Sequence, residues 1–142
     1  MGVQLAQEFA GQQLLDYGSG DGTFIALLQS SPAGPQLAVG AELADDVVED
    51  CRTRHGDPRL EFVRIDALDS PQYQARFDGL MCMEVLEHVV DRESVYALWK
   101  RLMKPRGRLI ISVPVETGMA LAIKQMMRKI AGWRGIGDYP GC

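Results

Sequence analysis

Three glycines and two carboxylates lie close together near the start of the chain. Residues 16–22 read DYGSGDG, so Asp16 precedes the glycines and Asp21 separates the last two. Glycine-rich turns after strands commonly bind phosphates, because glycine permits close backbone approach and the following helix N-terminus attracts anions. Carboxylates in the same turn would repel a phosphate. The stretch therefore favours a positively charged ligand over an anionic one.

Two phosphate-binding motifs can be compared with this stretch directly. A dinucleotide fingerprint requires G-x-G-x-x-G or A, and here Gly18 and Gly20 fit while Thr23 occupies the third position. A P-loop requires Gly-Lys-Ser/Thr, which does not follow. A nicotinamide-dependent oxidoreductase is an alternative function. Binding of NADH without binding of S-adenosylhomocysteine would support it.

Further acids are expected at the ends of later strands. Glu42 comes about 20 residues after the glycines, a spacing at which a carboxylate can accept both hydroxyls of a ribose. Asp66 and Glu84 follow further along the chain. S-adenosylmethionine has a ribose, an adenine amine, a free amino group and a positive sulfonium, but no phosphate. Acids at four strand ends suit that ligand.

The elements that must position these acids alternate between short apolar strands and helices. Apolar runs predict strands, and apolar residues three or four positions apart predict helices. Strands are expected at 13–17, 36–41, 60–65, 77–83 and 108–113, and helices at 3–10, 23–30, 44–54, 92–103 and 117–131, with a short helical segment from Pro71 and a turn at 104–107. This alternation predicts an α/β fold with a doubly wound, mainly parallel sheet. The ligand site of such a sheet lies beyond the carboxyl ends of its strands.

Composition limits the class of protein. The chain has 142 residues and a formal net charge of −4, which suits one globular domain and gives no general attraction to long nucleic acids or anionic membranes. No apolar run reaches the roughly 18 residues of a membrane span, and the N-terminus lacks a signal-peptide pattern, so no stable membrane anchor is expected. Cys51, Cys82 and Cys142 form no CxxC pair. Reduced thiols and a cytoplasmic location are therefore expected.

Five stretches together resemble the successive motifs of the class I S-adenosylmethionine-dependent methyltransferases. They are LLDYGSGDGTF, LAVGAEL, FVRIDALD, FDGLMCMEVLEHV and LMKPRGRLIISVP, which occur in the family's order and spacing between about residues 12 and 113. The resemblance implies a Rossmann-like methyltransferase fold with S-adenosylmethionine as the cofactor. It also implies an enzyme that transfers a methyl group to oxygen, nitrogen or carbon of a small-molecule acceptor.

The family's cofactor contacts can be carried over to the matching positions. Asp16, Gly18 and Gly20 would line the methionine moiety, and Glu42 would hold the ribose diol. Leu43 would lie against the adenine. Simpler interpretations stay open. Asp16 could serve merely to cap the glycine turn, and Glu42 could be a solvated residue at a strand end.

The adenine amine and the methyl group are assigned to the later motifs. Asp66 would accept the adenine amine, and Ala67 would supply a backbone N–H. Met83 and Glu84, at the end of the fourth strand, would face the sulfonium and the acceptor. Asp21 is expected to serve the turn or cap the following helix rather than contact the ligand.

His88 is the candidate general base, because the ordinary titration range of histidine suits proton removal. It follows Glu84, the other candidate catalytic residue, by four positions in the stretch MEVLEHV. A structural histidine bonded to a neighbouring loop is the alternative. Glu84, Glu87 and His88 also spell E-x-x-E-H, which resembles metal-binding runs in small-RNA 2′-O-methyltransferases and some ubiquinone-pathway O-methyltransferases. The RNA enzymes complete the set with a further downstream histidine, and the other histidine here is His55, so no metal is assigned. A metal-assisted RNA methyltransferase stays an alternative.

The end of the sequence departs from the family's pattern. Nothing after Val113 resembles the two strands that normally follow the fifth. We therefore expect a methyltransferase domain at 1–131 that lacks the C-terminal β-hairpin strands, and a flexible tail at 132–142. An unpaired strand edge would invite self-association. A module that binds S-adenosylmethionine without catalysing is the second functional hypothesis.

Overall fold

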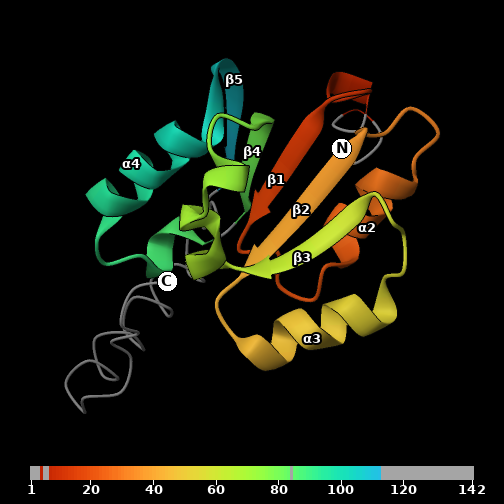
Figure 1. Cartoon of the computed structure of the whole chain (residues 1–142), viewed down its shortest axis with the longest axis horizontal. Coiled ribbons are helices and arrows are strands. Elements are labelled where there is room, and N and C mark those ends of the chain that lie inside the picture. The colour runs from red at the N-terminus through yellow and green to blue at the C-terminus, as the bar shows by residue number, and fades with distance from the viewer. Residues whose placement is uncertain (1–3, 5–6, 84, 113–142) are drawn as a thin grey trace, which may run out of the picture.

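In the described part of the chain, the fold is built on one five-stranded sheet whose strands are all parallel (Figure 1). The computed structural model describes residues 4, 7–83 and 85–112. The strands are β1 (Gln13–Tyr17), β2 (Leu37–Glu42), β3 (Leu60–Arg64), β4 (Phe77–Met83) and β5 (Met103–Ser112). Their order across the sheet is β3-β2-β1-β4-β5, so the direction of winding reverses between β1 and β4. A ligand site is expected beyond the carboxyl ends of the strands at that reversal.

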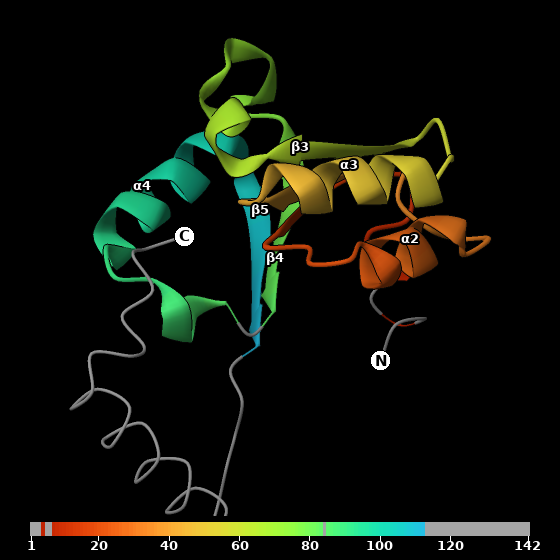
Figure 2. The same cartoon turned by 90° about the horizontal axis from the view of Figure 1, so that it is seen from below.

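Helices cover both faces of the sheet (Figure 2). They are α2 (Thr23–Ser30), α3 (Asp45–Arg54) and α4 (Arg92–Leu102), with the 3-10 segments η1 (Ile65–Asp69), η2 (Pro71–Tyr73) and η3 (Leu86–His88). Successive strand residues face opposite sides, so Leu14 joins the core under α2 and α3 while Leu15 joins the core under α4. This arrangement confirms the predicted doubly wound α/β fold.

One predicted turn is wrong. Residues 104–107 were expected to form a turn before the fifth strand, but β5 already begins at Met103 and runs through them. Phe77 pairs with Met103 and Gly79 pairs with Arg108, so two steps along β4 correspond to five along β5. The additional residues bulge within an extended strand. Pro105 and Gly107 therefore mark an irregularity of the strand, which a bulge can accommodate without ending it.

Two further predictions fall on other parts of the chain. The helix expected at 117–131 and the tail expected at 132–142 lie outside the described residues. Of the helix expected at 3–10, the described residues Gln4, Gln7 and Glu8 are helical, but Phe9 and Ala10 form a turn, so the helix ends before the predicted bound. Among the described residues, no helix has the length and apolar character needed to cross a membrane.

Candidate functional site

The glycine turn connects β1 to α2 and is bonded to the neighbouring strand. The N–H groups of Gly18 and Ser19 donate to the carbonyl of Ala41 in β2, over 2.8 and 3.0 Å. Gly18, Gly20 and Gly22 have φ values of 79°, 56° and 75°. A side chain would be strained in this left-handed region, which explains why glycine stands at each of the three positions.

Asp21 serves the turn itself. Its Oδ1 accepts a hydrogen bond from the N–H of Thr23 over 3.0 Å, at the start of α2. That hydrogen bond holds the pKa of Asp21 below its ordinary value. The expectation that Asp21 supports the turn and the following helix is confirmed.

Glu42, the last residue of β2, faces the glycine turn. Its Oε2 accepts the N–H of Gly20 over 3.0 Å, and its Oε1 accepts the N–H of Leu43 over 2.7 Å. An ionised carboxylate offers about four lone-pair sites. Two backbone amides therefore orient Glu42 and leave capacity for further donors, such as two ribose hydroxyls.

Asp16 is a buried acid within β1. Only 3% of its surface is exposed. Burial, and to a lesser degree the negative charge of Glu42, raises the pKa of Asp16 to about 7. Near neutral pH a positive ligand placed beside Asp16 would favour its charged form, since an opposite charge offsets the cost of burial.

A groove of about 590 Å³ opens at the carboxyl ends of β1, β2 and β3. Leu43 and Asp66, the predicted adenine contacts, both line this groove, and so does Tyr17 at the end of β1. The other residues that line it are Ile65, Asp69, Val90, Asp91, Ser94, Val95, Leu98 and Arg101. Arg101 is bonded to Asp69 over 3.2 Å. Acids thus outnumber bases in this groove, which disfavours a phosphate and suits an uncharged or cationic ligand.

Asp66 forms an ion pair with the neighbouring Arg64. The Nε of Arg64 lies 3.0 Å from Oδ1 of Asp66, and the same guanidinium lies 2.8 Å from the carboxylate of Asp45 at the start of α3. Ala67 lines a second groove, between α3 and β3, rather than the groove beside Leu43. A hydrogen bond from adenine to Asp66 would have to be shared with Arg64. The roles of Asp66 and Ala67 therefore stay predictions.

The end of β4 meets the glycine turn. A Cβ added to Gly18 would lie 2.5 Å from Cγ2 of Val85, so glycine is needed here for close approach as well as for its φ. Met83 ends β4 and packs partly buried against the core under α2 and α3. Glu84 lies outside the described residues.

His88 ends η3 and is exposed, and its backbone N–H donates to the carbonyl of Val85 over 2.9 Å. Its role as a base stays a prediction. The described residues contain no group of three His, Cys, Asp or Glu side chains that could hold a metal ion. Neither Glu84 nor the side chain of Glu87 is among them, so this finding does not test the E-x-x-E-H run.

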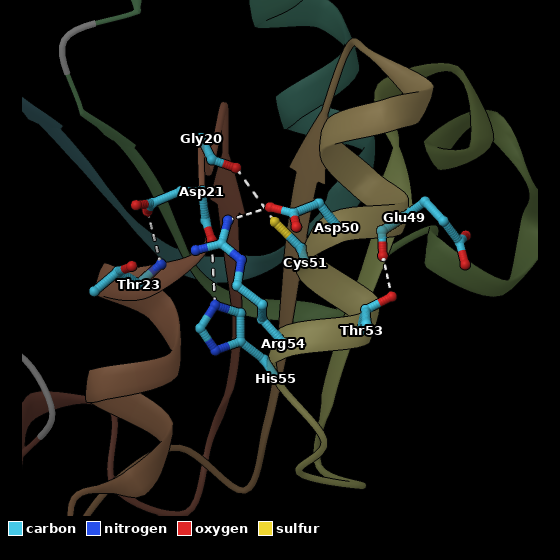
Figure 3. A network of polar contacts seen from close by, with 9 residues as sticks. All are labelled: Gly20, Asp21, Thr23, Glu49, Asp50, Cys51, Thr53, Arg54 and His55. Carbon is cyan, nitrogen blue, oxygen red and sulfur yellow. Dashed lines mark hydrogen bonds and ion pairs between the residues drawn. The ribbon is translucent and has the colours of Figure 1, made fainter.

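Sequence reasoning missed three residues around the site. Arg64 forms ion pairs with Asp45 and Asp66. Cys51 of α3 and His55, the residue after this helix, bond carbonyls of the glycine turn (Figure 3). The spacing of Cys51 and His55 places both on one face of a helix. That signal was present in the sequence, but their contact with the turn depends on how α3 packs on the sheet.

The sheet order, the glycine turn and the acid-lined groove together define the class of protein as a Rossmann-like methyltransferase domain. Known proteins agree, because a methyltransferase domain family matches residues 15–111, and the chain belongs to this family of S-adenosylmethionine-dependent methyltransferases. Demethylmenaquinone methyltransferase of Clavibacter sepedonicus is 36% identical over 103 residues, which cover 72% of this chain and 41% of that protein. Ubiquinone biosynthesis O-methyltransferase of Methylococcus capsulatus is 33% identical over 114 residues, covering 78% and 46%. The chain thus spans less than half the length of either relative.

A solved structure shows the same fold. It is phosphoethanolamine N-methyltransferase 2 of Haemonchus contortus, determined in complex with S-adenosyl-L-methionine. The TM-score is 0.67 at 19% identity, and the match covers 90% of this chain and 32% of that one. At this identity the likeness supports the architecture alone.

The residues present suit S-adenosylmethionine, the cofactor of the family. Glu42 keeps free acceptor capacity, and Asp16 is a buried acid that a positive charge would ionise. Space beside Gly20 is open, since a Cβ built there would meet no atom within 4 Å. A ligand that is positively charged and carries a diol matches these groups.

Proposed function

We propose that this chain is the cofactor-binding part of an enzyme that transfers a methyl group from S-adenosylmethionine to a small molecule. The observation that carries the proposal is the placement of Glu42. Its carboxylate is held by the N–H groups of Gly20 and Leu43 at the end of β2, and the next residue, Leu43, lines the acid-lined groove. Family membership supports the reaction class.

Each predicted contact has a defined task in this proposal. Glu42 would bind the ribose diol, and Leu43 would cover one face of the adenine. Asp16 would balance the positive charge of the methionine moiety from within β1, while Gly18 and Gly20 would let the backbone approach it closely. The acids thus select a cation, and the glycines make room for it.

The sulfonium of S-adenosylmethionine supplies an already activated methyl group, so alignment and exclusion of water are the main demands on the protein. Alignment can contribute about 7–11 kcal/mol in favourable cases. A base contributes a smaller factor, about 10²–10⁴, and only for an acceptor that must lose a proton. His88 would take that proton, and Glu84 and Met83 would lie beside the acceptor.

The acceptor that we propose is a ring of the quinone type. Demethylmenaquinone methyltransferase and ubiquinone biosynthesis O-methyltransferase, which resemble this chain, are named for such compounds. The net charge of −4 supports a small acceptor over a nucleic acid.

Calorimetry with S-adenosylhomocysteine and Glu42→Ala tests the cofactor site. The variant loses the acceptor for two ribose hydroxyls, so we expect affinity to fall about 10- to 100-fold. Glu49→Gln is a matched control, because Glu49 is an exposed acid of α3 that pairs with Arg52 and does not line the groove beside Leu43. A parent chain that binds NADH but not S-adenosylhomocysteine would overturn the proposal. Equal affinity of parent and Glu42→Ala would remove the role of Glu42.

A further inference from the structure

We infer that Cys51 of α3 and His55, the residue that follows α3, are positioning residues, which hold the glycine turn in the shape that presents Gly20 to Glu42. This inference rests on the proposed function, since that function makes Glu42 the ribose acceptor. Neither residue is expected to touch the cofactor. Both would act through the backbone of the turn.

Two carbonyls of the turn are bonded by residues at the C-terminal end of α3 (Figure 3). The Sγ–H of Cys51 donates to the carbonyl of Gly20 over 3.4 Å, and Nε2 of His55 lies 3.2 Å from the carbonyl of Asp21. A carbonyl can only accept, so Nε2 of His55 must carry the hydrogen. Two consecutive peptide groups are therefore oriented by α3.

Gly20 is consequently held from two sides. Its carbonyl accepts the thiol of Cys51, and its N–H donates to Oε2 of Glu42. The chain between Glu42 and Cys51 is short, because only Leu43 and Ala44 separate the end of β2 from the start of α3 at Asp45. The position of Glu42 relative to the turn thus depends on how α3 bonds the turn.

An aromatic ring lies beneath these contacts. Phe62 of β3 is 5.6 Å from the ring of His55, centroid to centroid, and a Cβ on Gly22 would lie 2.7 Å from Phe62 and 3.2 Å from Sγ of Cys51. Cys51 is fully buried. Losing the thiol would remove that donor from the carbonyl of Gly20.

Thr53 of α3 offers a control position on the same helix as Cys51. Thr53 is exposed and donates its hydroxyl to the carbonyl of Glu49 within α3, as Figure 3 shows. Thr53→Ala removes a side-chain hydrogen bond of similar kind that does not reach the turn. It separates a general effect on α3 from an effect on the glycine turn.

The experiment uses the 142-residue chain and four variants. His55→Phe keeps a ring against Phe62 but loses the N–H, whereas His55→Gln keeps an N–H donor. Cys51→Ala removes the thiol. Amide hydrogen exchange at residues 18–24 is measured without ligand, and affinity for S-adenosylhomocysteine is measured by calorimetry. Thermal unfolding is followed in parallel.

For His55→Phe and Cys51→Ala we expect exchange in the turn to rise about fivefold and affinity to fall by a similar factor, as loss of one hydrogen bond would cause. His55→Gln and Thr53→Ala should stay within about twofold of the parent. Unchanged exchange in His55→Phe and Cys51→Ala would overturn the inference. So would equal losses in His55→Gln and His55→Phe, since the ring alone would then matter. If the parent does not bind S-adenosylhomocysteine, the proposed function fails, while exchange in the turn still decides the positioning role.

Discussion

Asp16 makes a prediction about stability that depends on pH. The residue is 3% exposed, and burial raises its pKa from 3.8 to about 7, with a smaller effect from the charge of Glu42. Asp16→Asn keeps the shape of the side chain but removes its charge. The variant should therefore avoid the cost that the parent bears when Asp16 ionises inside the sheet.

The direction of the effect follows from proton binding. Between about pH 4 and pH 7 the folded chain keeps a proton on Asp16 that the unfolded chain has lost. The contribution of Asp16 to stability is therefore largest below pH 4, falls as pH rises through that window and levels off above pH 7. A difference of about three pKa units corresponds to a ceiling of about 4 kcal/mol.

Urea unfolding of both proteins between pH 5 and pH 8.5 provides the assay. We expect the free energy of unfolding of Asp16→Asn to exceed that of the parent by a margin that grows with pH and is about 2–4 kcal/mol at pH 8. Asp57→Asn is the control, because Asp57 is bonded to Arg59 and its pKa is lowered. That control should show no change of margin in this range. Parallel stability curves for parent and Asp16→Asn would refute the reasoning.

Two further predictions concern the glycine turn and the base. Gly22→Ala places a Cβ 2.7 Å from Phe62 at a φ of +75°, whereas Gly20→Ala at +56° meets no atom within 4 Å. Denaturation should show Gly22→Ala to be less stable than Gly20→Ala by about 1–3 kcal/mol, the usual cost of overpacking, and equal losses would mean that the ring moves aside. His88→Ala should leave affinity for S-adenosylhomocysteine unchanged and lower methyl-transfer turnover about 10²–10⁴-fold. Unaltered turnover would return His88 to a structural role.

Much of the fold could be predicted from local patterns. The strands at 13–17 and 77–83 and the helix at 23–30 have the observed bounds, since each is a clear apolar pattern that glycine, proline or polar residues delimit. The turn expected at 104–107 failed for a physical reason. Proline and glycine do favour turns, but pairing of β5 with β4 keeps the backbone extended there and places the surplus residues in a bulge.

The site, like the fold, has features that local sequence patterns predict and features that depend on tertiary packing. The sequence by itself determined that a glycine turn follows β1, that Asp21 caps it and that Glu42 ends the next strand, because each feature depends on neighbours in the chain. Parallel strands then bring these ends to one edge of the sheet.

The burial and the long-range contact partners of the site residues depend on the tertiary structure. Asp16 lies on a covered face, so its pKa rises, and Arg64 of β3 forms an ion pair with Asp45 of α3. Cys51 and His55 reach the turn because α3 packs beneath it. Contacts between residues distant in sequence depend on how helices pack and which way strand side chains face, and burial then determines the energy of each charge.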